Sequence, residues 1–455
     1  MGTTTARTPL GSLGRKRRTG RSGPLLRTLI AAGVIGVLCL WWLGAPSAPA
    51  FTPAFTATSL GELSGMVGAF LVCVQVLLIA RVPWFEHAVG MDRLVSWHRT
   101  LGSTVLFLIF THVLLMVLGV QFLTSGTPWA ATWEVLTSYP DMLTALIGTV
   151  LFLIIGISSA RIPRSRISYE AWYWLHVTAY IAIFLTFFHE LSAGVHFIDN
   201  PVNRAMWITL YVATASAVLT WRFILPAAAA WKHRLRVHQI VNEGDGINSV
   251  WLSGPHLDEL GVRAGQFMFF RFVTVGHMLT SHPFSISRLP AAGLMRITVG
   301  ALGDHSSNMH HLKPGTVVFA EGPFGHFTPE ASSRHKVLLI AGGAGIGPIR
   351  ALAQSLVQAG RDVVLVYRST SHDRLALEPE LRAMRPMVLH TVAGSRAELG
   401  HDPLGPQALK HLVKDISERE IYICGPEGMG ITAETSLSAL GIAKQLIHRE
   451  ILSMG

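Results

Sequence analysis

Charged residues are scarce in this chain. They make up 14% of the 455 residues, whereas a soluble protein carries roughly 25%. The deficit is uneven, because residues 25–225 are apolar runs separated by short polar gaps and residues 232–455 have an ordinary soluble composition. The sequence therefore indicates a membrane half and a globular half, at a length that suits about three domains.

Cysteine is also rare. The chain has three cysteines; Cys39 and Cys73 lie in apolar runs, and Cys424 lies in the soluble half. This number excludes a disulfide framework and a thiolate metal site. The sequence also lacks an EF-hand loop, so calcium control is not indicated.

Six apolar runs are long enough to cross a bilayer, which takes roughly 20 residues. They cover approximately residues 25–43, 61–80, 99–120, 142–159, 171–191 and 204–225. The first run could be a secretory signal, but its length and a poor cleavage site favour a membrane anchor. We therefore expect a basic tail at 1–24 and a six-span transmembrane domain at 25–226.

Lysine and arginine are absent from every second gap between these runs. Residues 44–60, 121–141 and 192–203 contain none, whereas the N-terminus, the other two gaps and the segment after the last run are basic. The positive-inside rule then predicts that both termini are cytoplasmic, in the plasma (inner) membrane. The net charge of +10 reflects this topology and contact with the lipid surface, so nucleic-acid binding is not expected.

Four histidines lie within the apolar runs. The third run carries His98 and His112, and the fifth carries His176 and His189. Fourteen residues separate two levels by ~21 Å, so the histidines pair by depth across the two helices. Buried imidazoles need compensation, and two stacked bis-histidine haems would provide it. The alternative is that each ring bonds a neighbouring helix.

The two histidine spacings differ in how well they fit one face of a regular helix. A spacing of 14 falls ~40° short of four turns and keeps both rings on one face, whereas 13 falls ~140° short. The fifth helix therefore needs a π-bulge or a bend between its histidines, which is common at functional sites.

The soluble half begins with strand-like segments. RLRVHQIVNE, NSVWLSG, GQFMFFRFV, PFSIS, LMRITVGAL and TVVFAEG are separated by glycine or proline turns. This pattern predicts a small antiparallel β-barrel at 232–330.

The pattern changes at residue 331. KVLLIA, DVVLVYRS, MVLHTVAG and IYICGP read as buried strands, and a glycine-rich turn and a helix follow the first of them. This order predicts an α/β domain with a parallel sheet at 331–455. Small residues at the turn let the backbone approach a pyrophosphate at the helix N-terminus; they are Gly342, Gly343, Gly345, Gly347 and Pro348.

The end of the second strand indicates which nucleotide binds. An NAD site usually places Asp or Glu on the ribose there, whereas this chain has Arg368 and Ser369. Arginine suits a 2′-phosphate, so NADPH is favoured and NADH stays possible. Ser395 and Arg396 could add a second phosphate contact. The alternative is that both arginines are solvated.

Several motifs in order now resemble a known family. SHPFSIS, GDHSS, EGPFG, AGGAGIGPI and YICGPEGM resemble ferredoxin–NADP reductase-type modules. The histidine spacings resemble the ferric reductase transmembrane domain. Together, residues 60–455 resemble the NADPH oxidase and ferric reductase superfamily of flavocytochromes.

The resemblance implies roles for these motifs. The flavin strand would contain His282, Pro283, Phe284 and Ser285, with the Ser285 hydroxyl near flavin N5 and Ser287 two residues on. The FAD pyrophosphate would lie against Gly303, Asp304, His305 and Ser306. Cys424, Gly425 and Pro426 would lie beside the nicotinamide, and Glu450 matches an acidic residue near the end of the chain. Ser285, Cys424 and Glu450 are thus the predicted catalytic residues.

The implied function is electron transfer across the membrane. Electrons would pass from cytoplasmic NADPH through FAD and two b-type haems (His98 with His176, then His112 with His189) to an external acceptor. That acceptor could be oxygen, a ferric chelate or a partner protein. The alternative from another class is a nucleotide-regulated channel or transporter.

Overall fold

The computed structural model describes residues 22–44, 51–164, 166–244, 246–274, 281–300, 308–372 and 375–451. The predicted pyrophosphate segment Gly303, Asp304, His305 and Ser306 lies outside these residues. The chain divides into two compact units, which are described separately below. The first comprises the described residues of Met1–Val89, Trp97–Leu153 and Ile181–Tyr211, and the second those of Gly90–Ser96, Ile154–Tyr180 and Val212–Gly455.

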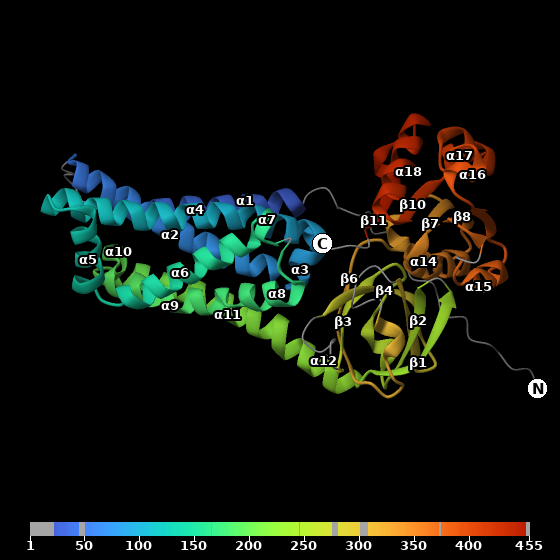
Figure 1. Ribbon diagram of the computed structural model, residues 1–455, viewed down its shortest axis with the longest axis horizontal. Coiled ribbons are helices and arrows are strands. Elements are labelled where there is room, and N and C mark those ends of the chain that lie inside the picture. Colours follow the sequence, from blue (N-terminus) through green and yellow to red (C-terminus); the bar gives the residue numbers. More distant parts are fainter. Residues whose placement is uncertain are drawn as a thin grey trace, which may run out of the picture. The chain divides into compact units, whose positions relative to one another are not determined.

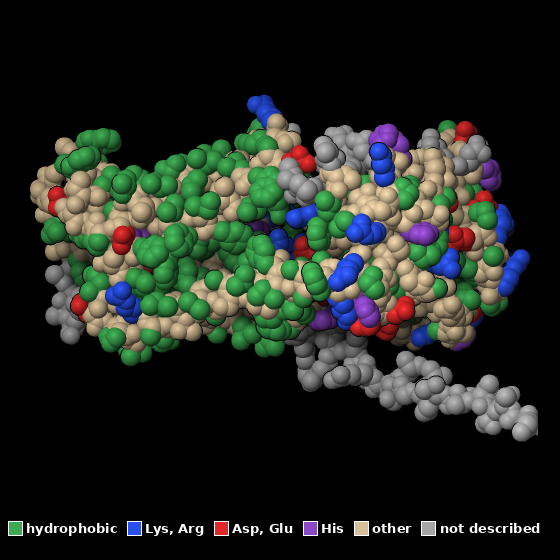
Figure 2. Space-filling model, turned by 90° about the horizontal axis from the view of Figure 1, so that it is seen from below, with side chains coloured by type: hydrophobic (Ala, Val, Ile, Leu, Met, Phe, Trp, Pro, Cys, Tyr) green, Lys and Arg blue, Asp and Glu red, His purple; other side chains and the backbone are tan. Residues whose placement is uncertain are grey.

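Six helical segments among the described residues are long and apolar enough to cross a membrane, as the sequence predicts. They are Gly23–Leu43, Pro53–Ile79, Arg93–Thr124, Met142–Ser159, Tyr169–Ala193 and Pro201–His233. Hydrophobic side chains cover most of the visible surface of these helices (Figure 2), as expected for groups that face lipid.

The spans are built from eight helices, which Figure 1 labels, and one π-helical turn. They are α1 (Ser22–Leu43), α2 (Pro53–Ile79), α4 (Met91–Thr124), α6 (Met142–Ser159), α8 (Tyr169–Val177), α9 (Ala179–Ala193), α11 (Pro201–Val218), η1 (Leu219–Ile224) and α12 (Leu225–His233). Shorter helices occur between them: α3 (Pro83–Val89), α5 (Pro128–Ser138), α7 (Arg161–Arg164) and α10 (Val195–Ile198).

The fifth span is not one regular helix. Helix α8 ends at Val177 and is capped by Thr178, whose backbone N–H bonds the carbonyls of Leu175 and His176; α9 begins at Ala179. The predicted irregularity between His176 and His189 is therefore confirmed as a break in the helix. The π-helical turn lies in the sixth span instead.

Glycines let α2 and α4 approach closely within the first unit. An added Cβ at Gly61 would lie 2.9 Å from the sulfur of Met116, and one at Gly119 would lie 2.3 Å from Oγ1 of Thr58. Small residues at such crossings are typical of membrane helix pairs, since van der Waals packing drives their association.

The second unit contains a six-stranded antiparallel sheet in the order β1-β2-β5-β4-β3-β6. Its strands are β1 (Arg236–Gly244), β2 (Ile247–Ser253), β3 (Phe267–Phe272), β4 (His282–Ala291), β5 (Leu294–Gly300) and β6 (Val318–Phe324). All six predicted strands are present. The sheet curls toward a barrel without closing into one, because the edge strands meet only around the bridge Arg236↔Val317. Its core includes Phe270, Ile286 and Met295.

A five-stranded parallel sheet follows, in the order β11-β10-β7-β8-β9. Its strands are β7 (Lys336–Gly342), β8 (Asp362–Ser369), β9 (Val388–Ala393), β10 (Glu420–Gly425) and β11 (Ile447–Ile451). Its helices are α14 (Ile346–Gln358), α15 (Glu378–Ala383), α16 (Arg396–Leu399), α17 (Pro406–Leu412) and α18 (Glu427–Ala439). The predicted strands are confirmed, and β11 is an additional edge strand.

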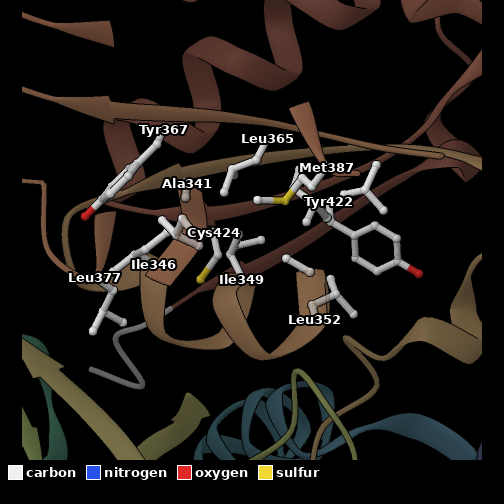
Figure 3. Close-up of a cluster of buried hydrophobic side chains, with 14 of the residues drawn as sticks. Ala341, Ile346, Ile349, Leu352, Leu365, Tyr367, Leu377, Met387, Tyr422 and Cys424 are labelled. Atoms are coloured by element: carbon white, nitrogen blue, oxygen red, sulfur yellow. The ribbon is translucent and has the colours of Figure 1, made fainter. Parts of the chain in front are cut away.

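Short 3₁₀ turns complete the second unit. They are η2 (Leu257–Leu260), η3 (Asn308–His311), η4 (Pro329–Ala331), η5 (Gly343–Gly345), η7 (Ile416–Glu418) and η8 (Lys444–Leu446). The turn η5 lies directly after β7, where the sequence predicts the glycine loop. A buried apolar cluster fills the space between this sheet and α14 (Figure 3).

Candidate functional site

Both histidines of α4 are oriented by backbone carbonyls of α2. Nδ1 of His98 lies 3.0 Å from the Gln75 carbonyl oxygen, and Nδ1 of His112 lies 2.8 Å from that of Gly61. If each Nδ1 carries the proton, Nε2 is left as the basic nitrogen. Metal-ligating histidines characteristically bond a carbonyl or carboxylate through the other ring nitrogen, which fixes the tautomer and the ring orientation.

Gly65 makes room for the His112 ring. A Cβ added at this position would lie 2.6 Å from Nδ1, 2.9 Å from Cε1 and 3.1 Å from Cγ of His112. Real Cβ contacts are longer, at about 3.5–4.0 Å between carbon atoms. The ring is therefore packed against the α2 backbone at a position where only glycine fits without displacement.

His112 and His189 face each other within the first unit. Their ring centroids lie 6.3 Å apart, with an interplanar angle of 41°. Two imidazoles on opposite sides of one iron would hold their centroids about 6 Å apart, given metal–nitrogen bonds of about 2.0 Å. Nδ1 of His189 is buried without a hydrogen bond of normal geometry. These residues fit a haem iron.

His98 and His176 belong to different compact units. His176 stacks on Trp172 with ring centroids 5.0 Å apart and an interplanar angle of 25°. Its Nδ1 lies 3.5 Å from Oγ of Ser159, which also accepts a 3.2 Å hydrogen bond from Nε1 of Trp172. The ring is thus held on one side by an aromatic neighbour.

The described residues contain no group of three or more His, Cys, Asp or Glu side chains placed to hold a metal ion. An axial haem site needs only two side chains, because the porphyrin supplies the other ligands. Haem ligation by the four histidines stays a prediction.

Strand β4 carries the predicted flavin motif. It pairs with β3 in the register Phe267↔Ser285, Met268↔Phe284 and Phe269↔Pro283. The ring of Phe284 lies 6.4 Å from that of Phe270 and 6.3 Å from that of His282. Residues 282–285 are partly exposed, whereas Ile286 and Ser287 are buried. The first four residues can therefore contact a ligand.

Ser287 is engaged by protein groups instead. Its Oγ accepts hydrogen bonds from Nε of Arg296 at 3.1 Å and from Oγ1 of Thr298 at 2.8 Å, and the side chain is fully buried. In this structure its hydroxyl therefore stabilises the contact between β4 and β5. The predicted contact of Ser287 with the flavin stays a prediction.

The glycine loop lies where the strand order of the parallel sheet reverses, between β7 and β10. Ligands of open α/β sheets bind at this position, outside the carboxyl ends of the strands. Gly343 has a φ of +51°, and an added Cβ there would meet nothing within 4 Å. Pro348 lies in the first turn of α14, where a missing N–H costs nothing. Gly343 and Ala344 are the partly exposed residues of the loop, so their backbone is accessible at the N-terminus of α14.

The Cys424-Gly425-Pro426 motif packs directly against this loop. A Cβ added at Gly345 would lie 2.2 Å from the Cys424 carbonyl oxygen, and one at Gly425 would lie 3.0 Å from that of Gly342. Glycine is therefore required at 345 and 425 because the two motifs pack closely on each other. A ligand bound beside the loop would need the same small residues.

The Cys424 thiol is fully buried and joins the apolar cluster that contains Ala341, Ile346 and Ile349 (Figure 3). Burial raises the pKa of this thiol well above its usual range, and the charge of Glu450 adds to the effect. The two residues are adjacent in the β10–β11 register. A neutral, fully buried thiol does not act as a thiolate, and the predicted place of Cys424 beside the nicotinamide stays a prediction.

The residues predicted at the 2′-phosphate meet at the carboxyl edge of β8 and β9. Nη1 and Nη2 of Arg368 donate to the carbonyls of Val392 and Gly394, at 3.2 and 2.5 Å. Burial, followed by the charge of Arg396, lowers the pKa of Arg368. Ser395 is the N-cap of α16, where its hydroxyl accepts a hydrogen bond from the N–H of Glu398. Arg396 is close enough to act on Arg368, and its own Nη2 pairs with Oδ2 of Asp402 at 3.1 Å.

Several residues escaped the sequence analysis. Gly61, Gly65 and the Gln75 carbonyl were missed, although glycines at 61, 65 and 68 form a small-residue stripe that indicates a close helix crossing. Glu190, which directly follows His189, accepts hydrogen bonds from Nε1 of Trp207 at 2.6 Å and from Tyr211 OH at 2.9 Å. A carboxylate beside a histidine in an apolar run was the available signal.

Comparison with known families matches two parts of the chain. Residues 64–187 match the family described as ferric reductase like transmembrane component. Residues 339–434 match the oxidoreductase NAD-binding domain. The matched ranges contain three of the four predicted haem ligands and the glycine loop, and His189 lies two residues beyond the first range.

Two curated relatives each match less than half of the chain. A flavohemoprotein of Halalkalibacterium halodurans is 27% identical over 215 residues, covering 41% of this chain and 51% of its own length. The ferredoxin reductase component of a 3-ketosteroid-9-alpha-monooxygenase from Mycolicibacterium smegmatis is 28% identical over 236 residues, covering 48% and 64%. The chain thus spans between half and two thirds of the length of these relatives.

Two solved structures are similar to about half of the chain. A ferredoxin NADP+ reductase from Neisseria gonorrhoeae with bound FAD and NADP has 16% identity and a TM-score of 0.42, covering 49% of this chain and 99% of its own. The FAD/NAD-binding domain of a nitric oxide dioxygenase from Vibrio cholerae has 22% identity and a TM-score of 0.41, covering 48% and 98%.

The six apolar helices, the two sheets and the two family matches agree with one another. The predicted resemblance to a fusion of the ferric reductase and NADPH oxidase kind is confirmed at this level. This chain is an integral membrane protein that joins a segment matching the ferric reductase like transmembrane component to a domain matching the oxidoreductase NAD-binding domain.

Proposed function

We propose that this protein passes electrons from cytoplasmic NADPH through FAD and two stacked bis-histidine b-type haems to an acceptor on the other side of the membrane. The carrying observation is the pair His112 and His189, with ring centroids 6.3 Å apart. The Gly61 carbonyl accepts from Nδ1 of His112 and leaves Nε2 for iron.

When bound, the flavin would exchange electrons in pairs or singly and each haem would carry one electron at a time. The protein supplies geometry. His98 and His112 are fixed by α2 carbonyls, while β4 presents Phe284 and Ser285. The loop from Gly342 to Gly347 offers its backbone to a pyrophosphate.

NADPH is proposed over NADH because of the charges at the end of β8. Arg368 is the penultimate residue of that strand, before Ser369, and the charges of Arg396 and Asp402 are close enough to act on it. An arginine in place of the Asp or Glu of an NAD site at the end of this strand favours a 2′-phosphate over a free ribose hydroxyl.

The plasma (inner) membrane and cytoplasmic termini are proposed from the basic residues in alternate gaps. The reductase module would then receive NADPH in the cytoplasm. Lipid is the expected surrounding partner, and nucleic acid is not expected. Oxygen, giving superoxide, or a ferric chelate is the proposed acceptor, with an extracytoplasmic partner protein as the alternative.

Haem content and reducibility test this proposal together. The purified protein should contain two haems, and anaerobic NADPH should reduce them. Substituting His112 or His189 by alanine should remove one haem, whereas His87→Ala, an exposed histidine on α3, should remove none. Two haems retained in both His112→Ala and His189→Ala would refute the ligand assignment. Protein without haem would favour the channel or transporter class.

The acceptor is tested by admitting air after reduction. Fast reoxidation would support oxygen, and slow reoxidation that a ferric chelate accelerates would support iron reduction. Slow reoxidation with oxygen and with a ferric chelate alike would favour a partner protein as the acceptor.

A further inference from the structure

Three charged side chains join the antiparallel sheet to the parallel sheet within the second unit. Arg296 on β5 donates from Nη1 to Oε1 of Glu380 at 2.5 Å and from Nη2 to Oε2 at 3.0 Å. Arg350 on α14 donates from Nε to Oε2 of the same carboxylate at 2.9 Å. Glu380 lies on α15, so one carboxylate links three elements. We call Arg296, Arg350 and Glu380 the arginine clamp.

The clamp is attached to the flavin strand through Ser287. Arg296 donates from Nε to its hydroxyl oxygen at 3.1 Å, and Arg350 donates from Nη1 to its carbonyl oxygen at 3.2 Å. Ser287 lies two residues after Ser285 on β4. A shift of either arginine would therefore be transmitted to the strand that carries the flavin motif.

The clamp is attached to the nucleotide loop at its other end. Arg350 lies in the first turns of α14, immediately after the loop from Gly342 to Gly347. A Cβ added at Gly347 would lie 3.4 Å from Cβ of Thr298 and 3.8 Å from that of Ser287. The helix that begins at the glycine loop is therefore in contact with β4 and β5, and the clamp holds that contact together.

The electrostatics make Glu380 the critical member. The side chains of Arg296 and Arg350 are only 1% and 6% exposed, whereas that of Glu380 is 35% exposed and opens to a groove lined by Arg288 and Gln354. Desolvation opposes ionisation of Glu380, but the hydrogen bonds and charges of the two arginines outweigh it and lower its pKa. Without this carboxylate, two buried cations would face each other unpaired, which drives them apart.

We propose that Glu380 is a positioning residue for hydride transfer, because it fixes the nucleotide loop against the flavin strand. The inference rests on the NADPH-to-FAD step of the proposed function. Hydride transfer moves one proton and two electrons from the dihydronicotinamide to the flavin. It needs the reacting atoms about 3–3.5 Å apart, and a misplacement of about 1 Å costs on the order of 100-fold in rate.

Anaerobic stopped-flow reduction of the flavin in the full-length holoprotein tests this role. Glu380→Gln keeps the shape of the side chain and removes its charge. Its limiting rate of flavin reduction by NADPH should fall by about 10- to 100-fold, and NADPH deuterated at the transferred position should show a larger isotope effect. FAD content per folded protein should stay at the wild-type level.

Glu378→Gln is the matched control. Glu378 lies on the same helix and pairs with the exposed Arg382 four residues away, so its loss should leave the limiting rate unchanged. Arg350→Lys keeps the charge and loses the forked contacts with Ser287 and Glu380, so it should also slow flavin reduction. This second variant tests the inference if Glu380→Gln does not fold.

Unchanged limiting rates and isotope effects in folded Glu380→Gln or Arg350→Lys would overturn the inference, since a purely structural role lowers the yield of protein and not the rate per bound FAD. A wild-type flavin that neither NADPH nor NADH reduces would instead overturn the proposed function. The readout involves neither the haems nor the acceptor, so the two failures are distinguishable.

Discussion

Replacing Gly65 by alanine should remove the outer haem while leaving the fold intact. The new methyl group would begin 2.6 Å from Nδ1 of His112, and contacts of this kind settle at about 3.5 Å or more. The ring must therefore retreat by about 0.9 Å, or the two helices must separate by a similar amount.

Such a shift is large on the scale of the site. The hydrogen bond from Nδ1 of His112 to the Gly61 carbonyl measures 2.8 Å, so a retreat of about 0.9 Å stretches it beyond the usual limit of about 3.2 Å. Metal–ligand distances tolerate only about 0.2 Å, and loss of an outer-shell partner typically costs 10- to 100-fold in metal affinity. We expect about one haem per chain in Gly65→Ala, against two in the wild type.

The assay is haem per polypeptide by pyridine haemochrome, with the reduced-minus-oxidised spectrum of the same sample. Gly36→Ala is the matched control, because it makes the same substitution in a membrane helix where an added Cβ meets nothing within 4 Å. His112→Ala is the positive control. Wild-type haem content and spectrum in Gly65→Ala would show that the position of the His112 ring does not govern haem binding.

Two further predictions concern the reductase module. Arg368→Ala should raise KM for NADPH by about tenfold, the value of one charge-assisted hydrogen bond, and leave KM for NADH unchanged; equal effects on both nucleotides would contradict a 2′-phosphate contact. Glu420 is bonded by His448 and by the backbone N–H groups of Ser333 and Arg334, at 2.7, 2.5 and 3.0 Å. Desolvation would raise its pKa, but these partners outweigh it and lower the pKa from 4.5 to about 2. The shift corresponds to a contribution of about 3 kcal/mol to the free energy of unfolding. This contribution is present above pH 4.5 and is lost as the pH falls toward 2. Glu420→Gln should therefore speed amide exchange at Ser333 and Arg334 by about 100-fold at pH 7, and unchanged exchange would refute the assignment.

The sequence by itself determined the elements of this protein. Apolar length predicts the six spans, because a bilayer demands about 20 residues that satisfy their own backbone hydrogen bonds. Alternation and glycine turns predict β1 to β6, and short buried runs predict β7 to β10. The odd spacing of His176 and His189 predicts an irregular helix, and the break at Thr178 bears this out. All of these signals are local along the chain.

Strand β11 was not predicted, because IHREI has neither an apolar run nor a turn that marks it, and only pairing with β10 makes it a strand. Only the tertiary structure decided which groups meet. The carbonyl of Gly61 reaches His112 across 51 residues, and Glu380 reaches Arg296 across 84. No periodicity records such partners, since they depend on how helices cross and sheets pack. The sequence therefore identified the residues with suitable chemistry, while packing chose the neighbours that orient them.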